Sequence, residues 1–235
     1  SYFTSEPSLT VTPLLNKLKR AYSTLCLVRK SCEINGLNRQ EMRTHRSNET
    51  IMLRPAKCSD LIVYSKILFI GIMDFAKSSF TNFTELSADS RHDIVQRNFH
   101  LMQSIDGAYR SLQHFPNDDT IMTSYTTFVN NEVLAGFVDT KRFQLKFCRQ
   151  FRRNIEQTFT VNKLYRFREV KPSAEEFVAV FGLALWNDYN STLSVEVSTL
   201  ARRNRNAIIA ELQTFYSLKG FRNVAARLGD LLSLL

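Results

Sequence analysis

The sequence predicts an almost entirely helical protein with one small β-hairpin. Its 235 residues include only 7 Gly and 5 Pro, the two residues that most often interrupt helices. Apolar residues recur at intervals of three and four along most of the chain, which is the period of one helix face. Since 44% of the residues are hydrophobic and no repeat or linker is visible, we expect a single globular domain over residues 1–235.

The first predicted helix runs from about Val11 to Glu33. Its apolar stripe consists of Leu14, Leu15, Leu18, Tyr22, Leu25 and Val28. The polar, aperiodic stretch that follows, residues 35–57, is predicted to be a loop. The next helix, Ala56 to Phe80, is apolar on nearly every face, so we expect other helices to surround it at the centre of the fold.

A third helix is predicted from Ser90 to Gln113, after a segment that supplies its cap. Residues 116–119, Pro-Asn-Asp-Asp, predict a turn. Because residues 121–129 are rich in Thr, Tyr and Phe, we expect a small hairpin there. Apolar residues at a spacing of four predict a further helix with a core-facing stripe, formed by Phe143, Phe147, Phe151 and Ile155.

Three helices are predicted in the C-terminal part. Ser173 and Glu176 have the spacing of a capping box and precede the apolar run 177–186. A longer helix is expected over residues 194–216. A glycine separates it from a last helix over residues 221–235.

The charge balance alone favours no single function. Lys and Arg outnumber Asp and Glu by 31 to 22, which gives a formal net charge of +9. The basic residues are interleaved with apolar ones at helical spacing, a pattern that favours solvated helix faces over a track for phosphates. A basic helical domain that binds nucleic acid is the alternative, and its binding would weaken steeply with salt.

Several classes of protein are not supported by the sequence. Apolar runs such as Ile67 to Met73 are far shorter than the roughly 20 residues of a membrane span. The four cysteines include no Cys-x-x-Cys pair, and we expect reduced thiols rather than metal ligands. No acid, base and nucleophile converge in one motif, and no glycine-rich phosphate loop occurs. We therefore expect no enzyme, no metal and no cofactor.

The segment from Phe75 to Ser111 resembles the signature of nuclear-receptor ligand-binding domains. The matching residues are Phe75-Ala76-Lys77, Phe83, Leu86, Arg91, Ile94-Val95 and Tyr109-Arg110-Ser111. Residues 173–186 resemble helix 8 of that family, and residues 226–229 resemble helix 10. The overall pattern is most similar to the divergent nematode members, and it departs from the signature where Ser90-Arg91 replaces the usual Asp-Gln.

This resemblance implies a three-layer antiparallel helical sandwich in a transcription factor of the nucleus, with a lipophilic, fatty-acid-like ligand in an internal pocket. It also implies that the zinc-finger DNA-binding domain and the activation helix 12 lie outside this chain, so DNA contact is expected only through that other domain. The alternative is a dimerisation or docking module of the same fold, its pocket filled by side chains such as Phe69, Phe99 and Met102.

The polar anchor of the ligand is expected at Arg110, the helix 5 arginine of the resemblance. A guanidinium in an apolar pocket binds a carboxylate or carbonyl with paired hydrogen bonds. The alternative is that Arg110 pairs with a backbone carbonyl or with Asp106 and only holds the hairpin in place. The lining is expected from Phe69, Ile70, Met73, Phe99 and Met102.

Two partner surfaces are also implied by the resemblance. The first is a groove for Leu-x-x-Leu-Leu helices of coregulators, with residues Met73, Lys77, Phe83, Val95 and Gln96. In this groove Lys77 would cap the bound helix, whereas its alternative role is that of an ordinary solvated side chain. The second is an interface for a homodimer, or a heterodimer with another nuclear receptor, with residues Arg227, Leu228 and Leu231.

Overall fold

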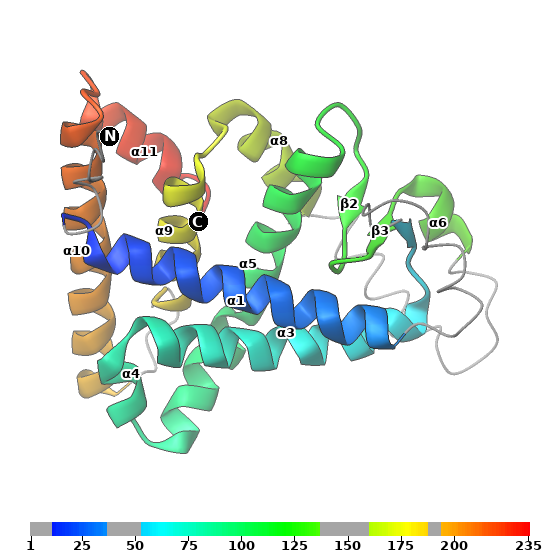
Figure 1. Cartoon of the computed structure of the whole chain (residues 1–235), viewed down its shortest axis with the longest axis horizontal. Coiled ribbons are helices and arrows are strands. Elements are labelled where there is room, and N and C mark those ends of the chain that lie inside the picture. Colours follow the sequence, from blue (N-terminus) through cyan, green and yellow to red (C-terminus); the bar gives the residue numbers. More distant parts are fainter. Residues whose placement is uncertain (1–10, 37–52, 137–159, 188–193) are drawn as a thin grey trace, which may run out of the picture. The chain divides into compact units, whose positions relative to one another are not determined.

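The computed structural model describes residues 11–36, 53–136, 160–187 and 194–235. The helices are α1 (Pro13–Asn35), α3 (Cys58–Ser79), α4 (Thr81–Glu85), α5 (Ala88–His114), α6 (Asn131–Gly136), α8 (Thr160–Val170), α9 (Ala174–Leu185), α10 (Val195–Leu218) and α11 (Val224–Leu232) (Figure 1). The strands are β1 (Arg54–Pro55), β2 (Ile121–Met122) and β3 (Thr127–Val129). The prediction of a mostly helical protein with a small β-element is confirmed. The helix predicted around Phe143 and Ile155 lies outside the described residues, as does most of the predicted loop 35–57.

The chain forms two compact units. The first comprises residues 1–24, 73–102 and 172–235, and the second comprises residues 25–72 and 103–171. The division falls inside α1, α3 and α5. The single domain expected from the sequence stays a prediction.

Helix α9 is the core of the first unit. Every residue from Glu176 to Leu185 is buried, and α9 packs against α10 and α11. The ring of Tyr22 on α1 meets the rings of Phe177 and Phe181 edge-on, with centroids 4.8 Å and 5.2 Å apart. Because aromatic pairs in this geometry add to the free energy gained by burial, they help to fix α1 against α9.

The N-terminus of α9 has the capping box predicted from its sequence. The N–H of Glu176 donates to Ser173 Oγ at 3.3 Å, and the N–H of Ser173 donates to Glu176 Oε2 at 2.8 Å. These two bonds satisfy N–H groups that the helix itself leaves without partners.

A three-stranded sheet lies in the second unit. Strand β3 pairs antiparallel with β2, Ile121 opposite Val129, and parallel with β1 on its other side. The predicted hairpin is therefore confirmed. The sequence did not predict β1, because a two-residue strand carries no detectable period of its own.

Some predicted details of the helices are wrong. Helix α3 is not enclosed on all sides, since Ile62, Val63 and Ile70 are 45%, 53% and 62% exposed. Val28, assigned to the apolar stripe of α1, is half exposed, and Arg29 is buried beside it. The short α4, which has one apolar residue, and the basic α8 were not predicted. In the described part of the chain, no helix combines the length and apolarity that crossing a bilayer requires.

Candidate functional site

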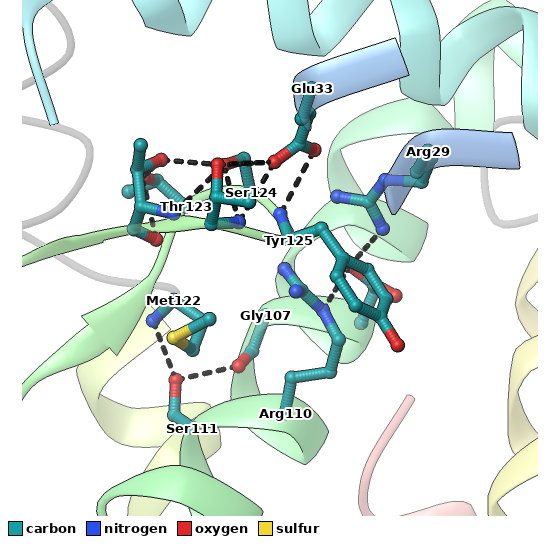
Figure 2. A network of polar contacts seen from close by, with 12 residues as sticks. Arg29, Glu33, Gly107, Arg110, Ser111, Met122, Thr123, Ser124 and Tyr125 are labelled. Atoms are coloured by element: carbon teal, nitrogen blue, oxygen red, sulfur yellow. Dashed lines mark hydrogen bonds and ion pairs between the residues drawn. The ribbon is translucent and has the colours of Figure 1, made fainter. Parts of the chain in front are cut away.

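A buried polar network joins α1, α5 and the turn between β2 and β3 in the second unit (Figure 2). Its charged members, Arg29, Glu33, Asp106 and Arg110, are named the charge cluster below. Their exposed fractions lie between 0% and 4%. Arg29 and Glu33 are four residues apart on α1, as are Asp106 and Arg110 on α5, so each pair occupies one helix face.

Asp106 binds both arginines of the charge cluster. Its Oδ2 accepts hydrogen bonds from Arg29 Nη1 at 2.8 Å and from Arg110 Nε at 3.2 Å. The ion pair between Arg110 and Asp106 is the contact that the alternative role of Arg110 required. The pairing with Asp106 is therefore present. Whether Arg110 can also bind a ligand depends on the remaining atoms of its guanidinium.

The guanidinium of Arg110 is not fully satisfied by this pair. Its carbon atom lies 5.3 Å from the ring centroid of Tyr125, a distance suited to a cation–π contact. Figure 2 shows the guanidinium between α5 and this ring. The Nη2 atom of Arg110 is buried and has no hydrogen-bond partner within the described structure. It is a buried donor, and an acceptor placed within hydrogen-bond distance of it would be bound strongly.

Glu33 is the acceptor for the turn of the hairpin. Its Oε1 accepts from the N–H of Tyr125 at 2.9 Å. Its Oε2 accepts from the N–H and the hydroxyl of Thr126 at 2.8 Å and 2.9 Å, and from the hydroxyl of Ser124 at 2.9 Å. Two backbone donors and two hydroxyls thus hold one carboxylate in the manner of an anion-binding turn.

The hairpin lies directly on α5 through Gly107 and Ser111. The hydroxyl of Ser111 donates to the carbonyl of Gly107 at 2.6 Å and accepts from the N–H of Met122 at 2.8 Å. A Cβ at Gly107 would lie 3.0 Å from the carbonyl oxygen of Met122. Glycine therefore permits the close approach that brings the turn to the charge cluster.

Two neighbouring titratable groups are neutral near pH 7. Burial raises the pKa of Tyr125, so its hydroxyl keeps its proton. Burial lowers the pKa of His114, and the charge of Arg110 lowers it further. Neither residue adds a charge to the cluster.

The expected ligand-lining residues differ in burial. Met102 is fully buried, whereas Phe69, Met73 and Phe99 are half-buried. Ile70 is 62% exposed, which does not fit a residue expected to line an internal pocket; its position on the outer face of α3 is the reason. The lining set as a whole stays a prediction.

The residues expected to form the coregulator groove all lie in the first unit. Lys77 and Gln96 are on the surface, and Lys77 Nζ lies 3.5 Å from Asp74 Oδ1. Phe83 and Val95 are fully buried, below the surface that an incoming helix would meet. The groove stays a prediction.

The residues expected at the dimer interface are partly engaged within the first unit. Arg227 binds Glu176 through two parallel bonds, Nε to Oε1 and Nη2 to Oε2, both 2.7 Å long. Leu231 is buried, and Leu228 is half-buried. Leu231 therefore has almost no surface left for a partner, whereas Leu228 keeps part of its surface.

Arg29 and Glu33 were not recognised as site residues from the sequence. A signal existed, because both continue the four-residue spacing of the buried face of α1 after Leu25. Charged residues at that position are typical of a solvated helix end, and their partners are more than 70 positions away. Within the described ranges, no group of three or more His, Cys, Asp or Glu residues is arranged to hold a metal ion.

A family model and two known proteins that resemble this chain all indicate the same family. Residues 46–235 match the family model described as the ligand-binding domain of nuclear hormone receptor. The "High zinc activated nuclear receptor protein" of Caenorhabditis elegans is 26% identical over 185 residues, covering 69% of this chain and 41% of that protein. "Nuclear hormone receptor family member nhr-53" of the same organism is 29% identical over 240 residues, covering 95% of this chain and 59% of that protein. The chain thus spans less than two thirds of the length of either relative.

Proposed function

Because this chain belongs to the family of nuclear hormone receptor ligand-binding domains, we propose that it binds a lipophilic, fatty-acid-like small molecule and regulates transcription in response. Proteins of this family are ligand-regulated transcription factors rather than enzymes. The described helices and small sheet agree with the helical sandwich of the family. The ligand would occupy an internal site, with Arg110 as its polar anchor.

The single observation that carries this proposal is the buried Nη2 atom of Arg110. A buried donor without a partner costs about 1–3 kcal/mol, which a ligand oxygen at this position would recover. The rest of the guanidinium is held in place by Asp106 and by the ring of Tyr125. An anchor fixed in this way loses little side-chain entropy when a ligand binds.

The proposal extends to the partners and location of the complete protein. We expect coregulator helices to bind near Lys77 and Gln96, with Phe83 and Val95 beneath, and a second receptor to bind near Leu228. We also expect the protein to act in the nucleus, with DNA bound by a domain outside this chain. Family membership supports each of these expectations.

The experiment that tests ligand binding uses the purified chain and three variants of it. Native mass spectrometry identifies any co-purified lipid, and thermal-shift assays measure stabilisation by hexadecanoic acid and by its methyl ester. Zinc chloride is included as a separate probe, because one relative is named for activation by high zinc. Stabilisation by zinc alone would contradict a lipophilic ligand.

Arg110→Ala is expected to weaken binding of the lipid by about 2–4 kcal/mol, because a charge-assisted hydrogen bond is lost. Arg110→Lys retains the charge without the forked geometry and should recover only part of the affinity. Arg166→Ala, an exposed arginine of α8, is the matched control and should bind as the parent does. No co-purified lipid and no stabilisation by either probe would favour the docking module with a filled pocket.

A further inference from the structure

Two buried side chains of the first unit, Ser79 and Trp186, have polar atoms without a partner. Ser79 is the last residue of α3, and Trp186 directly follows α9; their exposed fractions are 2% and 1%. Neither Ser79 Oγ nor Trp186 Nε1 has a hydrogen-bond partner in the described part of the chain. Because a buried polar group without a partner is costly, such atoms in folded proteins are generally satisfied by the chain or by a bound molecule.

The two residues lie where the end of α3 passes the end of α9. The rings of Phe75 and Phe181 meet with their centroids 5.1 Å apart. Five positions later in both segments, the rings of Phe80 and Trp186 meet at 5.3 Å. Ser79 is one helical turn after Phe75 and occupies the same buried face of α3, between these two ring contacts. The two polar atoms therefore belong to one place in the fold.

The indole of Trp186 is fixed by its surroundings. Two rings stand nearly perpendicular to it, that of Phe80 at 87° and that of Phe83 at 80°. The preceding carbonyl oxygen, that of Leu185, accepts a 2.9 Å hydrogen bond from the side chain of the buried Asn98. Since a ring face is only a weak acceptor for an N–H group, these contacts orient the indole without satisfying its donor.

The hydroxyl of Ser79 does not make the bond that several other helical hydroxyls of this chain make. These hydroxyls donate to the carbonyl oxygen four positions earlier in the helix, and they belong to Ser23, Thr24, Ser111, Thr214 and Ser217. The Ser79 hydroxyl is buried and makes no such bond. It can therefore act as donor or acceptor for a bound molecule.

We infer that Trp186 and Ser79 together bind one small neutral hydroxyl compound, water or a short alcohol, where α3 meets α9. A hydroxyl oxygen can accept from the indole N–H and at the same time share a hydrogen bond with Ser79 Oγ. Two neutral groups would not offset the cost of burying a carboxylate among aromatic rings, so the occupant is uncharged. The site lies in the first unit and Arg110 in the second, and the inference is independent of the proposed function.

The first test is the stability of Ser79→Ala, measured by urea denaturation followed by circular dichroism. If Ser79 binds the molecule, this variant leaves it with one partner fewer, and the unfolding equilibrium constant should rise at least about fivefold. If the hydroxyl has no partner, alanine removes a costly buried group and is the better helix former, so the constant should fall. Ser78→Ala, at the exposed neighbouring position, is the matched control and should not raise the constant. A Ser79→Ala variant at least as stable as the parent protein would overturn the inference.

The second test asks whether one molecule contacts both side chains. Trp186→Phe removes the indole donor and keeps an aromatic ring. In this background Ser79→Ala should no longer destabilise, because the shared molecule has already lost its other partner. An equal effect of Ser79→Ala in both backgrounds would overturn the inference. If Trp186→Phe does not fold, Ser79→Ala in the parent protein decides alone.

Fluorescence distinguishes the two kinds of occupant, since Trp186 is the single tryptophan of the chain. The probe is 1-propanol, added to the parent protein and to Ser79→Ala. A saturable change in emission that Ser79→Ala abolishes would support a bound alcohol. No saturable change, together with the expected loss of stability in Ser79→Ala, would support water. A saturable change that is the same in both proteins would overturn the joint role of Trp186 and Ser79.

Discussion

The Oε1 atom of Glu33 accepts a 2.9 Å hydrogen bond from the backbone N–H of Tyr125, although the two residues are 92 positions apart in the sequence. Through this bond the last turn of α1 fixes the backbone that carries the Tyr125 ring over Arg110. The position of an aromatic ring beside the proposed ligand anchor thus depends on a carboxylate from another helix. Glu33 acts on Arg110 indirectly, as a positioning residue.

Glu33→Gln is expected to lower the free energy of unfolding by about 2–3 kcal/mol, because its NH₂ group would face the donors that the carboxylate now accepts from. Urea denaturation followed by circular dichroism measures the change. The exposed Glu132→Gln should stay within about 0.5 kcal/mol of the parent protein. Equal effects of the two variants would contradict the role assigned to Glu33.

The two arginines that share Asp106 should be energetically coupled. Arg29→Met and Arg110→Met each remove one of the two ion pairs that the described residues form with Asp106, and the double variant removes both of these pairs. We expect the double variant to be less stable than the sum of the single effects by about 1–2 kcal/mol. A double-mutant cycle in urea measures this difference, and additive effects would show that Asp106 does not link the two residues.

Gly107→Ala should destabilise the protein, although alanine is the better helix former. Its Cβ would lie 3.0 Å from the carbonyl oxygen of Met122, which must then move away from α5. Gly229→Ala is the matched control in α11, where a Cβ meets nothing within 4 Å, and it should stabilise by up to about 1 kcal/mol. Thermal unfolding of both variants shows whether each substitution raises or lowers the melting temperature. Stabilisation by Gly107→Ala would contradict the close approach of the hairpin.

The Glu176–Arg227 pair predicts a loss of stability in acid. Burial alone raises the pKa of Glu176, but hydrogen bonds from Arg227, the Ser173 N–H and Tyr216 outweigh it, so the net pKa lies below the ordinary 4.5. A carboxyl with a lowered pKa stabilises the fold above its unfolded-state pKa, and this contribution disappears as the pH falls through its folded-state value.

Glu176→Gln should be about 3 kcal/mol less stable than the parent protein at pH 7, and this difference should shrink steadily below pH 4.5. Urea titrations at pH 7 and at several lower pH values measure it. Glu85→Gln, at an exposed position of α4, provides the control and should stay close to the parent protein in stability throughout the titration. A difference that is constant with pH would mean that the charge of Glu176 does not stabilise the fold.

The elements that the sequence predicted are those with a local cause. The apolar period of α1, α5 and α10 predicts helices at nearly the right residues, and the capping box at Ser173 is a contact within four positions. The enclosure predicted for α3 on the basis of its overall apolarity is wrong, since α3 is partly exposed, whereas α9 in the first unit is buried over ten consecutive residues. Which apolar helix is covered depends on packing partners, and no local pattern records them.

The candidate site was predictable only in the two members that lie on α5. Arg110 followed from the family resemblance, and Asp106 followed as a partner one helical turn away. Arg29, Glu33 and the turn residues come from distant segments, and their assembly depends on the close contact at Gly107. Single residues with ordinary surface chemistry, such as Glu33, become site residues only when tertiary structure buries them.

The short hairpin has a consequence for the order in which the chain folds. Strands of two and three residues are too short to persist alone, and four of the bonds that hold the turn come from a carboxylate some ninety positions earlier. Closing so long a loop costs chain entropy before any contact can offset that cost. We therefore expect the hairpin to form late, after α1 and α5 have packed together. In hydrogen–deuterium exchange during refolding, the Tyr125 and Thr126 amides should therefore be the last to become protected. Their protection would report when the Arg110 site is complete.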